Sequence, residues 1–187
     1  DELCDRLRLE GIPAARYHAG MSQEERQKAQ EDFQYDRAPV IIATNAFGMG
    51  IDKSNVRFVL HYNMPSCLEN YYQEAGRAGR DGEPSECILL FSPQDVVIQK
   101  FLLEHKEQNE VLEEVEEANL RKLYAMEHYC RTTSCLRQTL LHYFGEDAPA
   151  RCNHCSTCNG DYEEVDMTEE TKSIVKCIHE ARRPYGI

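Results

Sequence analysis

Short apolar runs, separated by segments with helical patterning, restrict the first half of this 187-residue chain to an α/β fold. Val40–Thr44 is the clearest run, because its β-branched residues are typical of a strand that is buried on both faces. We also expect strands near 14–18 and 56–62, and another buried strand over 86–91. The short links between strands and helices predict a parallel sheet with helices on its faces.

Two capping boxes predict where helices begin. Ser22 is followed three residues later by Glu25, which predicts a helix that ends between residues 33 and 35. Ser66 and Glu69 have the same spacing and predict a second helix. Elsewhere we expect helices over 1–11, 93–105, 109–130 and 133–144, and a last helix capped by Thr168.

Strand patterning stops near residue 92, and only helices are expected from there to about residue 158. We therefore predict three parts, which are an α/β domain over 1–92, a helical domain over 93–158, and an acidic linker with the start of another domain over 159–187. The chain begins without Met, and the last predicted helix has no partner among the residues after it. We expect it to be a piece of a longer protein.

The net charge of −12 argues at first against a nucleic-acid partner, because phosphate binding needs a basic surface. Two acidic runs, 104–117 and 161–170, carry all of this net charge, so the rest of the chain sums to zero. A basic or neutral binding face is therefore still allowed. Most acidic side chains in the two runs are expected to be solvated surface.

Neither a membrane span nor a secretory signal is present in the sequence. We expect an intracellular protein, cytoplasmic or nuclear, with no membrane partner. In that setting the nine cysteines favour reduced thiols or a metal site over a disulfide framework.

The segment Gln73–Gly82 combines arginines with glycines. Arg77 and Arg80 lie three residues apart, and three glycines leave the backbone free to approach a ligand closely. A guanidinium group is a permanently charged donor that matches phosphate oxygens. The segment therefore predicts a polyphosphate site, with a glycine-rich surface loop as the alternative.

Three cysteines, Cys152, Cys155 and Cys158, are separated by two-residue gaps. Thiolates at this spacing can bind one tetrahedral zinc ion, which needs a fourth ligand. The sequence leaves four candidates for that ligand: Cys135, Cys130, His154 and His142. A redox-active or fortuitous cluster is the alternative to zinc.

Together these motifs resemble the RecQ family of DNA helicases over essentially the whole chain. His18–Met21 looks like motif IV of the family, residues 43–53 like motif V, and Gln73–Gly82 like motif VI. Cys135 with the three clustered cysteines is similar to the family's structural zinc site, and 182–187 to an early part of its winged helix. The resemblance implies a second RecA-like lobe, a P-loop NTPase-type helicase C-terminal lobe, followed by a helical zinc-binding subdomain.

The resemblance also implies roles for residues of the motifs. Arg80 would act as the arginine finger on the γ-phosphate of ATP, together with Arg77, and Gln73 would help to position the nucleotide. Gly50 and Asp52 would lie near the ribose. Such an arginine stabilises the charge of the phosphoryl-transfer transition state.

DNA contacts are implied by the same resemblance. His18 and Thr44 would contact the phosphate backbone of single-stranded DNA, and Asn45 and Arg57 are further candidates. Such contacts position a strand without reading its sequence. The alternative for His18 and Thr44 is local bonding to their own backbone.

No phosphate-binding loop and no Asp-Glu-x-His box occur in the sequence. ATP and Mg²⁺ would therefore be bound jointly with a first RecA-like lobe, and the chain by itself would not hydrolyse ATP. The implied parent is an ATP-dependent 3′ to 5′ DNA helicase of repair and recombination that acts on single-stranded and duplex DNA. A non-catalytic DNA- or protein-binding module and an RNA helicase of the same superfamily are the alternatives.

Overall fold

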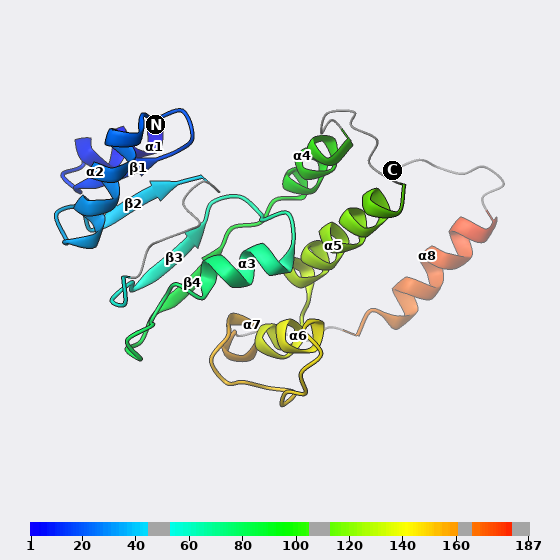
Figure 1. Ribbon diagram of the computed structural model, residues 1–187. Helices are drawn as coiled ribbons and strands as arrows, with labels where there is room; N and C mark the ends of the chain where they lie inside the picture. The colour runs from blue at the N-terminus through cyan, green and yellow to red at the C-terminus, as the bar shows by residue number, and fades with distance from the viewer. Residues whose placement is uncertain (45–52, 105–112, 161–165, 181–187) are drawn as a thin grey trace. The chain divides into compact units, whose positions relative to one another are not determined.

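Parallel strand pairing organises the first half of the chain. The computed structural model describes residues 1–44, 53–104, 113–160 and 166–180. The strands are β1 (Ala14–Tyr17), β2 (Val40–Ala43), β3 (Phe58–His61) and β4 (Glu86–Leu89). Within the described residues, β1 pairs with β2 and β3 with β4, both in parallel (Figure 1). The predicted α/β fold with parallel strands is confirmed, although these strands form two separate two-stranded sheets.

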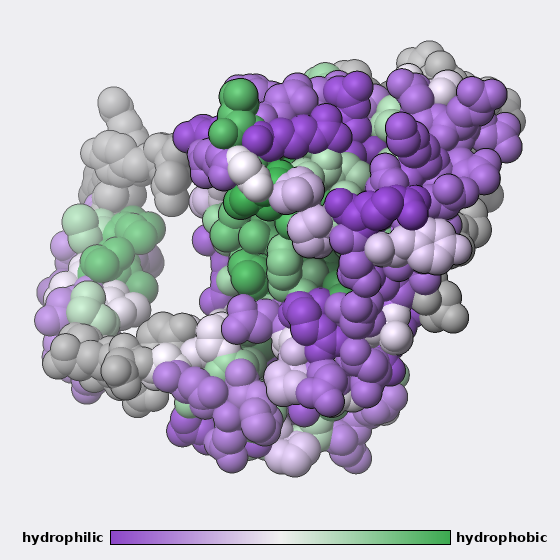
Figure 2. Space-filling model, turned by 90° about the vertical axis from the view of Figure 1, so that its left-hand side faces the viewer, coloured by the Kyte–Doolittle hydropathy of each residue, from purple (hydrophilic) through white to green (hydrophobic). Residues whose placement is uncertain are grey.

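The strands are more exposed than their sequences predict. β2 is only half-buried and β4 is largely exposed, so the prediction of burial on both faces is wrong. In β3 the burial alternates, with Phe58 and Leu60 more exposed than Val59 and His61, as expected where helices cover one face only. Figure 2 shows an area of apolar surface bordered by hydrophilic residues.

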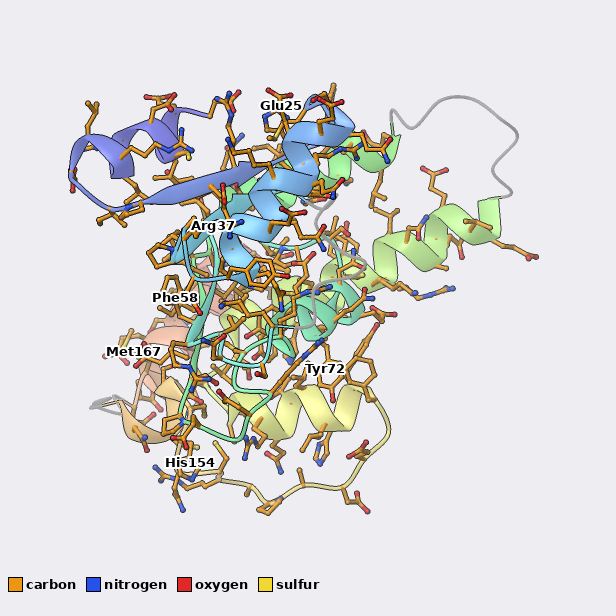
Figure 3. All side chains as sticks on the ribbon, turned by 60° about the vertical axis from the view of Figure 1, so that its left-hand side comes forward. Glu25, Arg37, Phe58, Tyr72, His154 and Met167 are labelled. Carbon is orange, nitrogen blue, oxygen red and sulfur yellow. The ribbon has the colours of Figure 1, made fainter. Side chains whose placement is uncertain are left out.

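Two helices make the crossovers that parallel pairing requires. α2 (Gln23–Gln34) carries the chain from β1 to β2, and α3 (Leu68–Ala75) carries it from β3 to β4. The predicted capping box of α2 is confirmed. The Ser22 hydroxyl accepts from the Glu25 N–H at 3.2 Å, and the Glu25 carboxylate accepts from the Ser22 N–H at 2.9 Å. Glu25 is labelled at the start of this helix in Figure 3.

The second predicted capping box does not form. α3 begins one residue later than Ser66 predicts, with Cys67 at the N-cap, so Glu69 is out of position for the box. Ser66 instead accepts a hydrogen bond from the Asn70 amide at 3.1 Å, and Glu69 pairs with Lys122 at 2.9 Å. A shift of one residue is enough to exclude the reciprocal geometry.

Most of the other helices agree with the predicted pattern. They are α1 (Glu2–Leu9), α4 (Pro93–Glu104), α5 (Glu113–Arg131), α6 (Leu136–Tyr143) and α8 (Thr168–Glu180). The short α7 (Ser156–Asn159) lies in the cysteine cluster, where the sequence predicts no helix. Asp166, rather than Thr168, caps α8, because its carboxylate accepts from the Thr168 N–H at 2.9 Å. No helix among the described residues is both long and apolar enough to cross a membrane.

The chain divides into two compact units, Asp1–Arg131 and Thr132–Ile187. In the first unit, α5 packs on both α3 and α4. Its largest fully buried side chains include Leu68 of α3 with Leu123 and Met126 of α5. The predicted domain limits at residues 92 and 158 stay predictions.

Removing the Leu123 side chain tests this core. Leu123 is completely buried, so Leu123→Ala should lower the free energy of unfolding by about 2–5 kcal/mol through lost burial and a residual cavity. Urea unfolding followed by circular dichroism measures this loss. Leu9→Ala is the matched control, since Leu9 is 88% exposed and its loss should cost less than about 0.5 kcal/mol. Equal losses in the two variants would contradict the packing of α5.

Candidate functional site

The segment after α3, residues 76–82, is a tight loop, called the arginine loop, whose backbone is bonded to the segment just before β3. The N–H of Gly79 donates to the carbonyl of Val56 at 2.9 Å. Gly79 has φ +64°, and a Cβ placed there would lie 2.4 Å from the Ser85 hydroxyl and 3.0 Å from the Glu83 carbonyl. Both the backbone conformation and the lack of space therefore require glycine at this position.

An arginine from outside the loop is bonded to it. Arg57 precedes β3, and its guanidinium donates to both carboxylate oxygens of Asp81, at 2.6 and 2.5 Å. It also donates to the carbonyls of Pro84 at 3.3 Å and Asn55 at 3.1 Å. The hydrogen bond from Arg57 is the main reason that the pKa of Asp81 lies below its ordinary value, so the ion pair persists at neutral pH.

The predicted nucleotide residues lie on and just after α3. Gln73 is exposed on the helix, Arg77 is half-buried in the first turn after it, and Arg80 is exposed. The Nε of Arg80 donates to the Gly76 carbonyl at 3.3 Å. Gly50 and Asp52 lie outside the described residues, so their predicted roles near the ribose stay predictions, as do those of the arginines and Gln73.

A buried histidine attaches α3 to the neighbouring strand. His61, the last residue of β3, contacts the Glu74 carboxylate through Nε2 at 2.8 Å, and its ring lies 5.1 Å from that of Tyr71. The His61 side chain is only 7% exposed. Sequence reasoning missed this pair and the pairing of Arg57 with Asp81, because each joins residues that are distant in the chain. Strand register is the signal for the second pair, since Phe58 aligns with Glu86 and brings Arg57 beside the loop.

Two predicted DNA contacts lie at the same edge of the first sheet. His18 and Thr44 directly succeed β1 and β2, whose last residues are register partners, and the Thr44 N–H donates to the Tyr17 carbonyl at 3.1 Å. His18 also contacts the Asp1 carboxylate at 3.1 Å through Nε2. The carboxyl ends of parallel strands are where ligands of α/β sheets bind. Asn45 lies outside the described residues.

Four cysteines of the second unit converge on one point. The sulfur atoms of Cys135, Cys152, Cys155 and Cys158 all lie within 4.8 Å of one another. The sulfurs of Cys135 and Cys155 are 3.9 Å apart, and all four thiols are free. A tetrahedral zinc ion with bonds of about 2.3 Å separates its sulfur ligands by about 3.8 Å, so the cluster fits zinc.

The other candidates for the fourth ligand are not part of the cluster. Cys130 lies on α5 of the first unit, and His142 lies on α6. His154 is exposed in the loop between two of the cysteines (Figure 3), where its backbone N–H donates to the Cys152 sulfur at 3.4 Å. Among the candidates that the sequence leaves open, the structure brings Cys135 to the other three.

Hydrogen bonds to sulfur favour the thiolate form that zinc requires. Burial opposes charge on Cys152, but N–H donors of His154 and Cys155 outweigh it and lower the pKa of that thiol. At Cys155 burial is again the opposing influence. Donors that include the Thr157 hydroxyl and the Leu136 N–H outweigh burial and lower the pKa of Cys155 to about 5.

The second unit has little apolar core to support it. Among its described residues, Cys135 alone is buried, at 5% exposure, and every described residue of α8 is exposed. A unit this small with so little buried apolar surface needs another source of stability. Metal binding at the four cysteines can supply it, because binding at a structural zinc site is coupled to folding.

Two family models match the chain in succession. The helicase conserved C-terminal domain matches residues 1–82, and the RecQ zinc-binding family matches residues 93–159. The first match contains β1 to β3, α3 and the arginine loop. The second contains all four clustered cysteines. The residues that carry the chemistry therefore lie within the matched ranges.

Similar proteins come from bacteria, eukaryotes and a virus. The chain is 46% identical over 186 residues to the ATP-dependent DNA helicase RecQ of Bacillus subtilis, covering all of this chain and 31% of that protein. It is 44% identical over 179 residues to an ATP-dependent helicase of Saccharomyces cerevisiae, covering 92% of this chain and 12% of that protein. It is 34% identical over 197 residues to a putative ATP-dependent RNA helicase of Acanthamoeba polyphaga mimivirus, covering 100% of this chain and 35% of that protein. The chain thus spans about a third of these relatives' length or less.

Substitution of one clustered cysteine tests the metal centre. Purified chain should contain about one zinc per molecule, and Cys155→Ser should lose it, because a closed structural site needs all four ligands. Elemental analysis measures the metal content under reducing conditions. Cys177→Ser is the matched control, since Cys177 is exposed on α8 and outside the cluster. Zinc retained by Cys155→Ser, or absent from the unsubstituted chain, would contradict the assignment.

Two glycine substitutions separate crowding from backbone strain in the arginine loop. Gly82→Ala should cost roughly 1 kcal/mol, because Gly82 has φ +83° but open space around it. Gly79→Ala should cost about 1 kcal/mol more, since its Cβ would overlap Ser85 and Glu83. Denaturant unfolding of the two variants measures the difference. Equal stability would mean that the loop does not pack as described.

Proposed function

Because the chain belongs to the RecQ family of DNA helicases, we propose that it supplies the arginine finger and part of the single-stranded DNA track of an ATP-dependent 3′ to 5′ helicase. The observation that carries the proposal is the loop after α3, which contains Arg77 and Arg80. This loop lies within residues 1–82, the range that matches the helicase conserved C-terminal domain. Hydrogen bonds hold the backbone of this loop in place, so both arginines extend from a fixed backbone. Such preorganisation favours catalysis by charge stabilisation.

In this proposal the nucleotide and Mg²⁺ lie between this chain and a first RecA-like lobe, which supplies the phosphate-binding loop. Arg80 stabilises the charge that develops on the γ-phosphate in the transition state, with Arg77 beside it. Gln73, one turn earlier on α3, orients the nucleotide or links its state to the lobe. Gly50 and Asp52 border the ribose.

DNA would pass the edge of the first sheet where His18 and Thr44 lie together. Contacts from these residues, with Asn45 of the next segment, would hold the phosphate backbone without reading bases. ATP binding would close the cleft between the lobes and hydrolysis would reopen it. Alternating grip on the backbone would then move the strand.

Zinc has a structural role in this proposal. Bound by the four cysteines, it would hold α6 and α7 together and leave no open position for catalysis. DNA repair and recombination are the processes in which such a helicase would act.

An RNA helicase is a second candidate, favoured by the similarity to a putative ATP-dependent RNA helicase at 34% identity. The zinc-binding match and the similarity to a DNA helicase at 46% identity favour DNA. Unwinding of DNA and RNA duplexes of the same sequence, measured side by side with the full-length protein, decides between them.

Truncation of the proposed finger tests the role of the loop. In the full-length protein, Arg80→Ala should bind a non-hydrolysable ATP analogue normally but lose turnover by about 10³-fold or more. Steady-state ATPase assays with saturating single-stranded DNA measure this loss. Arg121→Ala is the control, because Arg121 is exposed on α5 and paired only weakly with Glu117 at 3.6 Å. Unchanged turnover in Arg80→Ala would overturn the finger assignment, and no DNA-stimulated turnover in the unsubstituted protein would favour a non-catalytic binding module.

A further inference from the structure

Arg57 is exposed, yet its guanidinium donates four hydrogen bonds, three of them to the turn that follows Arg80. All three guanidinium nitrogens have an acceptor: Nη2 binds Asp81, Nη1 the Pro84 carbonyl and Nε the Asn55 carbonyl. Four of the five guanidinium N–H groups are thus used within the chain, and one N–H of Nη1 remains. A two-pronged phosphate contact by Arg57 would therefore have to exchange at least one of these bonds.

The backbone beside Arg57 holds the same loop. The Val56 carbonyl accepts from Gly79, and the Arg57 carbonyl accepts from the Glu86 N–H at 3.0 Å. Asp81 also accepts from the Glu83 N–H at 3.1 Å, which closes the turn after it. The segment before β3 therefore bonds the loop on both sides of Arg80, at Gly79 and at Asp81.

Charge gives a second reason for this arrangement. Asp81 is the next residue after Arg80, and an unpaired carboxylate there would weaken the attraction of Arg80 for a polyphosphate. The Arg57 guanidinium neutralises that carboxylate and holds its pKa below the ordinary value. Together the side chains of Arg57, Arg80 and Asp81 carry a net charge of +1.

We propose that Arg57 is a positioning residue, which acts through Asp81 to fix the place and the field of Arg80, rather than a contact to DNA. The proposal rests on the proposed function, in which Arg80 serves the γ-phosphate. Arg57 does not touch the nucleotide. Its effect on turnover comes from holding the adjacent backbone, where a misplacement of about 1 Å can cost on the order of 100-fold in rate.

Kinetics and DNA binding of the full-length protein distinguish the two roles of Arg57. Arg57→Ala should lower kcat for ATP at saturating single-stranded DNA by about 10- to 100-fold, with its DNA affinity and the salt dependence of that affinity unchanged. Arg57→Lys should have a kcat between those of the unsubstituted protein and Arg57→Ala, because an ammonium can pair with Asp81 but lacks the separate nitrogens that bond the Pro84 and Asn55 carbonyls. Combining Arg57→Asp with Asp81→Arg should recover part of the lost kcat. Arg37→Ala is the matched control, since Arg37 forms a comparable exposed pair with Asp32 at 2.7 Å away from the loop.

A direct DNA contact predicts the opposite pattern. Arg57→Ala would then weaken DNA binding, reduce the slope of log affinity against log salt by about 0.7, and leave kcat at saturating DNA unchanged. That result would overturn the proposal. Failure of the exchanged pair to recover any kcat would also count against it.

Hydrogen exchange provides a readout that does not depend on activity. In Arg57→Ala, amides of the 79–84 segment should exchange faster than in the unsubstituted protein, while those of α2 keep their rates. Unchanged exchange in 79–84 would refute the positioning role. If the unsubstituted protein shows no DNA-stimulated ATPase, the proposed function fails, and faster exchange in 79–84 would still support the bonding role of Arg57.

Discussion

Parallel pairing of short strands is the constraint on which the rest of the first unit depends. Two strands can pair in parallel only if the chain returns to the starting edge between them, and α2 and α3 make these returns. The pairing of β1 with β2 brings His18 and Thr44 to one edge. The pairing of β3 with β4 places Arg57, just before one strand, beside the turn that precedes the other. Both candidate surfaces are therefore consequences of strand register, although their residues are more than twenty positions apart in sequence.

Features that depend on neighbouring residues could be predicted from the sequence. The Ser22 capping box and the three closely spaced cysteines are local, and the structure contains both. The Ser66 box failed although its spacing is the same, because α3 begins with Cys67, not Ser66, at its N-cap. Burial of β2 and β4 was mispredicted for a related reason: apolar composition indicates what a strand can bury, whereas exposure depends on which elements cover it.

Long-range contacts explain what sequence reasoning could not supply at the candidate site. The segment Gln73–Gly82 can be recognised from its arginines and glycines, but nothing within it indicates that Asp81 binds Arg57 or that Glu74 binds His61. Those partners lie 24 and 13 positions away. From sequence alone, Arg57 is easily interpreted as a ligand of DNA phosphate. Its geometry assigns the guanidinium to a carboxylate of the same chain, where its charge supports the neighbouring arginine.

The scarcity of buried side chains in the second unit makes its stability a property of the surroundings as well as of the sequence. If zinc binds the folded cluster and not the unfolded chain, each tenfold rise in free zinc above the dissociation constant adds about 1.4 kcal/mol to the free energy of unfolding. The first unit, with Leu68, Leu123 and Met126 fully buried, has a core that does not vary in this way. The stability of the second unit would then depend on the zinc concentration in the cell, whereas that of the first unit would not. Metal supply would determine how much of the protein carries a folded second unit.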